Sequence, residues 1–309
     1  MPWQRKADMD LELDADQLAL GRAVGGELDR CGDAAHPGPV HNCLTGLQVY
    51  ALEAPAAAGG LELGLGYAVV VCDELGRRAA PDGYRAAALL VDLLGADDAA
   101  PTGDRCAEVA AGTVRVTLSG GADDADVMVA VDGAGRLRAV HRRSGSLWAE
   151  VAGTGPAGPP TRPLHRARVR QAAYLCGLAA RAHRLAVERA AERHQFGQAL
   201  LSHQAIAFPL ARQLAHLRAA RLLVHEAAWR ADTGAPAALA TTRALAYASE
   251  LALEITAAAV HVHGAFGLTG SAPVHRYYRA AAVEALRFGR PAELWRAAGR
   301  WERSAEETA

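Results

Sequence analysis

Apolar residues recur at spacings of three and four through the C-terminal half of the chain, which is the period of an amphipathic helix. After residue 202, for example, Ile206, Leu210, Leu214 and Leu217 share one face. The pattern predicts long helices over about 164–193, 202–230, 236–263 and 273–289, and a terminal helix over 291–306. Because the connections between the long helices are short, we expect a four-helix up-down bundle.

The period changes to two between residues 113 and 152. Val114, Val116 and Leu118 alternate with polar residues, which is typical of a half-buried strand. Further strands are predicted at 127–131, 136–140 and 147–151. These strands predict a small β region, and the Gly- and Pro-rich residues 153–163 predict a linker after it.

The first part of the chain is predicted to be helical. One helix lies within residues 9–31, capped by Asp14 or Asp16, and a short helix is expected at 43–52. A pair of helices is expected within 59–95. The predicted fold class is therefore mainly α, with an N-terminal helical region over 1–103, a short β region over 104–155 and a C-terminal four-helix bundle over 156–309.

The composition is that of an ordinary globular protein, with 51% hydrophobic and 22% charged residues. A formal net charge of -1 gives no reason to expect a nucleic acid or an anionic membrane as partner. The five cysteines show no metal-ligand spacing, and no signal peptide is recognisable. No apolar run approaches the roughly 20 residues that span a bilayer. We therefore expect a cytoplasmic protein.

A tight reversal joins the first two long helices. Gly197 is expected to end the first helix in the left-handed conformation, and Ser202 to cap the second. Arg193, Phe196 and Gly197 form an R-x-x-F-G motif, and Gln204 follows seven residues after the glycine. By itself, the motif is equally consistent with a plain helix hairpin whose basic C-terminus is favoured by the helix dipole.

This motif resembles the one in the C-terminal helical domain of acyl-CoA dehydrogenases, and other segments match the same family. Residues 9–31 resemble its first helix, and residues 59–95 contain a Gly-Gly-Leu segment followed by a helix that ends in Glu-Leu-Gly-Arg77. With residues 164–290, the resemblance covers over half of the chain. The chain is identified as a divergent, shortened member that lacks the usual catalytic glutamate.

The resemblance implies an FAD cofactor, held partly across a subunit interface. Near the end of the third long helix, two glycines match those that let backbone amides approach the adenine half of FAD, and a histidine replaces the usual glutamine. The implied cofactor-binding residues are Arg193, Phe196, Gln204, His261, Gly264 and Gly267. A glycine cap on the helix is the competing interpretation. No third metal ligand stands near His261 and His263 in the sequence, so no metal is expected.

In most members of that family, the fourth long helix ends in Glu-Gly-Thr, and this glutamate is the catalytic base. The corresponding position is Phe288, and the alternative position at the start of the first long helix is Ala167. Neither side chain can accept a proton. Glu284 lies one turn before Phe288 and is the nearest substitute, although a surface glutamate is the plainer interpretation. The Thr-Glu-Pro…Gly-Ser-Asp segment that lines the flavin ring in relatives is absent.

The leading functional hypothesis is flavin-dependent α,β-dehydrogenation of an acyl thioester on CoA or a carrier protein. Such a chain would be an oxidoreductase and a flavoprotein, acting as a homo-oligomer or as one subunit of a mixed complex with another dehydrogenase-like chain. The alternative is a non-redox member of the fold, either a non-catalytic partner subunit or an enzyme repurposed to work without flavin. A plain helical interaction module is a third hypothesis.

Overall fold

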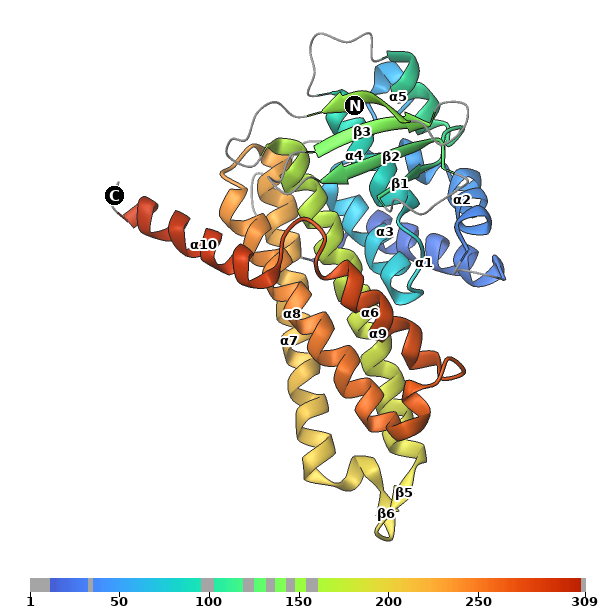
Figure 1. Cartoon of the computed structure of the whole chain (residues 1–309), viewed down its shortest axis with the longest axis vertical. Helices are drawn as coiled ribbons and strands as arrows, with labels where there is room; N and C mark the ends of the chain where they lie inside the picture. The colour runs from blue at the N-terminus through green and yellow to red at the C-terminus, as the bar shows by residue number, and fades with distance from the viewer. Residues whose placement is uncertain are drawn as a thin grey trace.

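The computed structural model describes residues 12–32, 36–95, 103–118, 125–131, 137–142, 148–153 and 161–306. Figure 1 shows an elongated bundle of long helices, with the N-terminal helices and a small sheet gathered at one end of it. The chain enters the bundle from this end and reverses at the far end through a short hairpin. Each long helix therefore places one of its termini near the N-terminal part and the other at the far end.

The bundle is built from α6 (Arg162–Glu192), α7 (Gln204–Thr233), α8 (Ala238–His263) and α9 (Pro273–Glu284), followed by α10 (Pro291–Glu306). The predicted up-down bundle of long helices is confirmed. The fourth helix is shorter than predicted, because it stops at Glu284 and does not reach residue 289. Phe288 and Gly289 have φ values of 61° and 131°, which are outside the right-handed helical region.

α6 is the central helix of the molecule. It packs against α3 (Leu65–Arg77) and α4 (Gly83–Leu94) of the N-terminal part and against α7, α8 and α9 of the bundle. Residues 166–179 of α6 are all buried. Pro163 lies in its first turn, where the missing N–H has no helical partner to lose. The two parts of the molecule thus share one helix as a common core.

The N-terminal part begins with α1 (Ala15–Arg30), where the Asp14 side chain accepts a hydrogen bond from the Gln17 N–H at 2.8 Å. Asp14 is therefore the cap, as one of the two predicted alternatives. The helix predicted at 43–52 is misplaced, because α2 (Pro37–Gly46) starts at a proline that suits a first turn. The other elements are η1 (Val49–Ala51), η2 (Ala56–Ala58) and an unpredicted α5 (Gly103–Ala110), which spans the predicted boundary at residue 103.

A four-stranded sheet lies against α4. Its order is β1 (Val116–Thr117), β2 (Val127–Val131), β3 (Leu137–Arg142) and β4 (Trp148–Gly153), with β1 parallel to β2 and the other pairs antiparallel. The predicted first strand is thus reduced to two residues, whereas the other three lie close to their predicted places. Residues 154–160 of the predicted linker lie outside the described residues.

One stretch, Ala238–Leu268, is long and apolar enough by length and composition to cross a membrane, with a mean hydropathy of 1.4. This finding differs from the expectation that no apolar run approaches the length of a membrane span. The stretch consists of α8 and the turn that follows it, and α8 packs against α6, α7, α9 and α10. Its apolar side chains are therefore used in helix–helix contacts of the bundle.

α3 and α6 cross in direct backbone contact at two glycines. A Cβ atom on Gly76 of α3 would overlap the carbonyl oxygen of Tyr174 in α6. A Cβ atom on Gly177 of α6 would in turn overlap the carbonyl oxygen of Asp73 in α3. Only a hydrogen atom fits at either position, so this pair of glycines sets how closely the N-terminal helices approach the bundle.

Replacing Gly177 by alanine should destabilise the protein by about 1–3 kcal/mol, because the new methyl group overpacks the helix crossing. Gly26→Ala in α1 is the matched control, since the nearest atom to a Cβ there is Arg30 Nη1 at 3.7 Å. Alanine is a better helix former than glycine, so the control should be neutral or more stable. Denaturant unfolding measures both, and equal stability of the two variants would contradict the close crossing.

Candidate functional site

A β-hairpin joins α6 to α7 at the far end of the bundle (Figure 1). Its strands are β5 (His194–Gln195) and β6 (Gln198–Ala199), and the two turn residues, Phe196 and Gly197, have φ values of 54° and 81°. Two left-handed residues in a two-residue loop are typical of a type I′ turn. Gly197 is left-handed as predicted, but it turns a hairpin and does not end the helix, because α6 already ends at Glu192.

Arg193 precedes this hairpin and is exposed. Its backbone is fixed, because its N–H donates to the Arg189 carbonyl at 3.0 Å and its carbonyl accepts from the Leu200 N–H at 2.8 Å. Its guanidinium makes no ion pair or hydrogen bond within the described part of the chain. A cation on a fixed backbone is therefore free to bind an anionic group.

Phe196 and Gln204 are also exposed. The Phe196 side chain is 92% exposed at the tip of the hairpin, and its ring meets that of His203 edge-on with centroids 6.0 Å apart. Gln204 is the first residue of α7.

The predicted N-cap of α7, Ser202, is wrong. His203 precedes the helix, and its side chain makes no capping hydrogen bond. Ser202 lies in η3 (Leu200–Ser202), a short turn between the hairpin and α7.

The glycine-containing corner ends α8 at the same end of the bundle as the hairpin (Figure 1). Gly264 has a φ of 66° and terminates the helix. At Gly267, a Cβ atom would lie 2.7 Å from the Val260 carbonyl oxygen and 2.8 Å from the His263 Cβ atom. Local geometry thus accounts for both glycines, as the competing interpretation of a helix cap requires.

The two histidines of this corner differ in their surroundings. His261 is exposed, whereas the His263 ring is hydrogen-bonded through Nδ1 to the Ala259 carbonyl at 2.8 Å. Within the ranges that the structure describes, no group of three or more His, Cys, Asp or Glu side chains is arranged to hold a metal ion.

Glu284, the last residue of α9, is held by three side chains. Its Oε2 atom accepts hydrogen bonds from Arg85 Nη1 at 2.8 Å, Gln171 Nε2 at 3.0 Å and Arg287 Nε at 2.7 Å. It is only 8% exposed, so the interpretation as a surface glutamate is wrong. Burial raises the pKa of Glu284, but Arg85 and Arg287 outweigh this effect and lower the pKa to about 2. Such a carboxylate is a weak base, and its role as the substitute base stays a prediction that this geometry disfavours.

A cavity of about 410 Å³ lies beside Glu284, between α2, α4, β1 and the end of α9. Its wall includes Asp82 and Arg287, whose Oδ2 and Nη2 atoms are 3.3 Å apart. His41 also lines it, with its ring hydrogen-bonded to the Tyr50 hydroxyl at 2.9 Å. The cavity therefore combines these charged and polar groups with apolar wall residues such as Val40 and Val116.

A second buried charge cluster was not predicted from the sequence. Arg170 of α6 is fully buried and bonds Glu53 through Nη2 at 2.6 Å and Asp92 through Nη1 at 2.7 Å. Arg166, one turn earlier, reaches Glu53 at 2.7 Å and Asp232 of α7 at 3.2 Å. Burial raises the pKa of Glu53, but the two arginines more than offset it and lower the pKa. The signal in the sequence was the run Arg-Ala-Arg-Val-Arg at 166–170, which precedes the apolar stretch 172–180 of the same helix.

Solved structures of acyl-CoA dehydrogenases share this fold. The butyryl-CoA dehydrogenase of Megasphaera elsdenii has a TM-score of 0.75 and 20% identity, over 94% of this chain and 99% of that chain. The ChsE4-ChsE5 complex of Mycobacterium tuberculosis gives a TM-score of 0.77 and 21% identity, over 94% of this chain and 98% of that chain. At this level of identity, the likeness shows the fold alone.

Two proteins with related sequences act on CoA thioesters by their names. The caffeyl-CoA reductase-Etf complex subunit CarC of Acetobacterium woodii is 43% identical over 94 residues, and the short-chain-specific acyl-CoA dehydrogenase of Megasphaera elsdenii is 36% identical over 120 residues. These alignments cover 30% and 39% of this chain but only 25% and 31% of the relatives. Residues 160–301 match the family described as acyl-CoA dehydrogenase, C-terminal domain. Residues 160–301 thus belong to the C-terminal domain of the acyl-CoA dehydrogenase family, and the chain shares the fold of its solved members.

Both residues at the positions that the family resemblance assigns to the catalytic base are buried. Phe288 is 7% exposed, and its carbonyl oxygen accepts a hydrogen bond from Arg168 Nε at 3.4 Å. Ala167 is 3% exposed. Neither residue brings a titratable group to the interior, so Glu284 is the nearest carboxylate along the helix that carries the usual base.

The residues that the resemblance assigns to FAD lie at the far end of the bundle. Family members are FAD-dependent flavoproteins. None of the six residues assigned to the cofactor lines the cavity beside Glu284, and none lines a larger cavity where α1, α3, α6 and α7 meet. Arg193 offers an unpaired guanidinium to a pyrophosphate, and Phe196 offers an exposed aromatic face. These exposed groups suit the phosphate and ring groups of a nucleotide bound at the surface of the bundle.

Glu284→Gln should change how stability depends on pH. The pKa of Glu284 is about 2 in the folded protein against an ordinary value of 4.5, so its ionised form stabilises the fold above about pH 5. This stability, about 3 kcal/mol, is lost as the pH falls from about 5 to 2. The variant should be less stable than wild type at pH 7, and the difference should shrink over that interval.

Denaturant unfolding at several pH values between about 2 and 7 measures this difference. Glu250→Gln, which changes an exposed glutamate on α8, is the matched control and should follow wild type at every pH. A Glu284→Gln curve parallel to wild type would show that the carboxylate is not held as its contacts indicate.

Proposed function

We propose that this chain takes part in flavin-dependent α,β-dehydrogenation of an acyl thioester as one subunit of a mixed assembly. In this assembly, a second dehydrogenase-like chain supplies the catalytic base. The observation that carries the proposal is that no free carboxylate stands at the base positions. Phe288 and Ala167 occupy them, and Glu284 is tied to two arginines.

The reaction explains why a base must come from elsewhere. An α-proton leaves the thioester while the β-carbon loses a hydride, and FAD supplies the hydride acceptor when it is bound. A positioned base contributes about 10²- to 10⁴-fold to such a proton transfer when its pKa lies near the working pH. The Glu284 carboxylate, with a pKa of about 2, is far from that range.

The exposed hairpin supports a site shared between chains. Arg193, Phe196 and Gln204 belong to the hairpin segment and the start of α7. His261, Gly264 and Gly267 belong to the end of α8 and the turn after it, at the same end of the bundle. We propose that these side chains and the glycine-containing corner hold the nucleotide end of an FAD whose flavin ring lies in the neighbouring subunit. The amides near Gly264 would approach the cofactor where a side chain would stand in the way.

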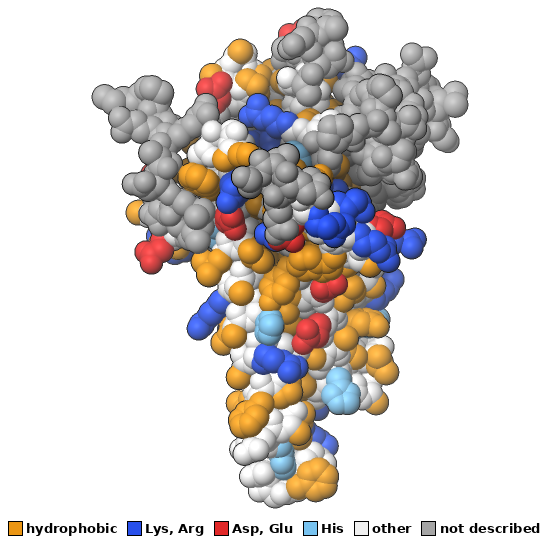
Figure 2. Space-filling model, turned by 90° about the vertical axis from the view of Figure 1, so that its left-hand side faces the viewer, with side chains coloured by type: hydrophobic (Ala, Val, Ile, Leu, Met, Phe, Trp, Pro, Cys, Tyr) orange, Lys and Arg blue, Asp and Glu red, His pale blue; other side chains and the backbone are white. Residues whose placement is uncertain are grey.

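An apolar stripe on α7 supports assembly. Phe208 and Leu222 are 65% and 51% exposed, and Ala211, Ala215 and Ala219 are exposed between them at spacings of three and four. Figure 2 views the side of the molecule nearest α7 and shows hydrophobic side chains along the whole bundle. An exposed apolar stripe of this length is typical of a helix that packs against another chain.

Two relatives work as parts of assemblies by their names. CarC is a subunit of the caffeyl-CoA reductase-Etf complex, and ChsE4 and ChsE5 form a complex with each other. A non-redox role on the same fold is the second candidate, favoured by the same closed base positions. The two candidates differ in their expected cofactor, because a non-redox member would bind no FAD.

Arg193→Ala should weaken FAD binding about tenfold or more, since a charge-assisted hydrogen bond contributes about 1.5–3 kcal/mol. Arg296→Ala, which removes an exposed arginine on α10, should leave binding unchanged. Fluorescence titration with FAD, for the purified chain and for the chain with its dehydrogenase-like partner, measures both. Absence of FAD binding in either form would favour the non-redox candidate, and equal binding by the two variants would exclude the hairpin from the site.

The purified chain without a partner should not dehydrogenate acyl-CoA thioesters, because it lacks a base near neutral pH. Dye reduction with a series of straight-chain acyl-CoA substrates and added FAD measures this activity. Turnover by the chain alone that is lost in Glu284→Gln and retained in Glu250→Gln would overturn the mixed-assembly proposal and make Glu284 the base.

A further inference from the structure

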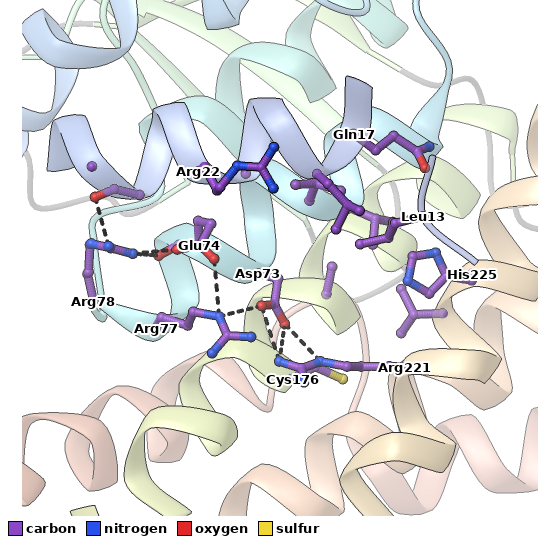
Figure 3. A pocket seen from close by; sticks show the side chains of 18 of the residues that line it. Leu13, Gln17, Arg22, Asp73, Glu74, Arg77, Arg78, Cys176, Arg221 and His225 are labelled. Atoms are coloured by element: carbon purple, nitrogen blue, oxygen red, sulfur yellow. Dashed lines mark hydrogen bonds and ion pairs between the residues drawn. The ribbon is translucent and has the colours of Figure 1, made fainter. Parts of the chain in front are cut away.

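A larger cavity lies far from the hairpin, where α1, α3, α6 and α7 meet (Figure 3). Its volume is about 500 Å³, which is within the range of about 300–1,000 Å³ that small-molecule sites occupy. None of the residues proposed for FAD or for the base lines it. The cavity is therefore separate from the proposed function.

The floor of this cavity is apolar. It is formed by Val69 and Val70 of α3, Ala173 and Cys176 of α6, and Val224 of α7, and each of these residues is at most 7% exposed. Burial raises the pKa of the Cys176 thiol to about 12, so this group stays neutral. Such a floor suits a hydrocarbon group, because every atom buried there leaves water.

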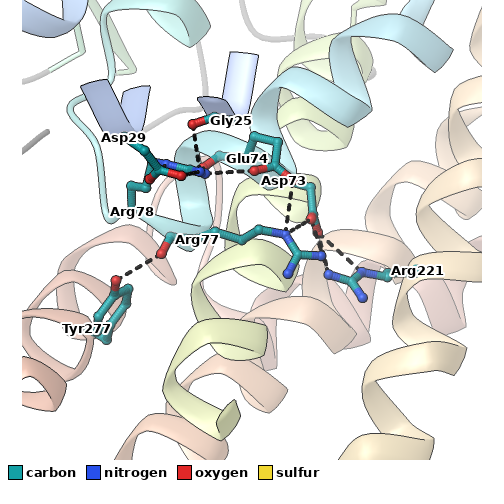
Figure 4. A network of polar contacts seen from close by, with 8 residues as sticks. All are labelled: Gly25, Asp29, Asp73, Glu74, Arg77, Arg78, Arg221 and Tyr277. Carbon is teal, nitrogen blue, oxygen red and sulfur yellow. Dashed lines mark hydrogen bonds and ion pairs between the residues drawn. The ribbon is translucent and has the colours of Figure 1, made fainter. Parts of the chain in front are cut away.

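The rim on the α3 and α7 side is cationic. The Asp73 carboxylate binds two arginines, Arg77 through Nε at 2.7 Å and Arg221 through Nη2 at 2.8 Å (Figure 4). The Arg77 side chain remains 38% exposed, and its Nη atoms make no hydrogen bond to any residue that the structure describes. Asp73 thus positions two guanidinium groups, and the Arg77 Nε atom also lies 3.3 Å from Glu74 Oε1.

Arg22 adds a further cation from α1 (Figure 3). It is exposed, and it has no ion pair with any described residue. The two remaining acids of the rim, Asp29 and Glu74, are bonded to Arg78 at 2.8 Å and 2.6 Å. The rim therefore carries four arginines, Arg22, Arg77, Arg78 and Arg221, against the three carboxylates of Asp29, Asp73 and Glu74.

We propose that this cavity binds an amphipathic anion, specifically a fatty carboxylate of medium chain length. The hydrocarbon tail lies on the floor of Val69, Ala173 and Val224, and the carboxylate lies at the rim between Arg22 and Arg77. The arrangement explains why an apolar floor is combined with arginines that keep unused donors. A charged head group prefers paired guanidinium donors, whereas a neutral apolar ligand has no use for them.

Isothermal titration of the purified chain with decanoate tests the proposal, with decan-1-ol as the neutral probe of the same length. We expect one decanoate per chain and clearly weaker binding of the alcohol. Arg22→Gln should weaken decanoate binding about threefold to tenfold, and Arg22→Glu should weaken it further. Both variants change an exposed side chain without a partner, so folding should be unaffected. Arg296→Gln is the control and should bind like wild type.

Three results would overturn the proposal: no decanoate binding, equal affinity for decanoate and decan-1-ol, or unchanged affinity in both Arg22 variants. The measurement involves no flavin and no dehydrogenation. A failure here therefore leaves the proposed function standing, and a failure of FAD binding leaves this cavity unaffected.

Discussion

The buried arginines of α6 constrain the whole molecule. A guanidinium without a partner in a protein interior costs several kcal/mol, so Arg166 and Arg170 can be buried only where acids reach them. Those acids come from three places in the chain: Glu53 after η1, Asp92 in α4 and Asp232 at the end of α7. The need to pair these arginines fixes how α6 is rotated about its own axis. The glycine crossing between α3 and α6 fixes the distance of α6 from the N-terminal helices. α6 consequently makes the largest contact between the N-terminal helices and the bundle.

The same rotation decides what the interior near the usual base can do. It directs Gln171 toward Glu284, while Arg85 and Arg287 approach the same carboxylate from α4 and from the turn after α9. The interior that results is rich in charge, and Glu284, held by these three side chains, is a weak base. The exposed end of the bundle has the opposite character, with an unpaired arginine and an exposed phenylalanine. The chain thus keeps the fold of its solved relatives, while the groups that are open to a ligand at this end lie on its surface.

Some elements of the fold and the site could be predicted from the sequence, and others could not. The long helices follow from an apolar period of three to four, and the left-handed Gly197 follows from its place in a tight reversal. Ser202 and the 43–52 helix were misassigned, because cap preferences and Gly- or Pro-rich composition are weak signals when a proline can also start a helix. Glu284 is buried and not exposed as expected, because it is paired with Arg85. This partner lies 199 residues away in the sequence, so no local pattern indicates the pair.

The sequence by itself determined the helical class, the order of the elements and the family, because periodicity and short motifs are local properties of the chain. It also determined that Phe288 and Ala167 cannot accept a proton, since that depends on residue type alone. The tertiary structure decided which charges are paired, which glycines are required by close backbone contact, and where cavities lie. These properties depend on distances between residues far apart along the chain, and only the packing of α6 against its neighbours sets those distances.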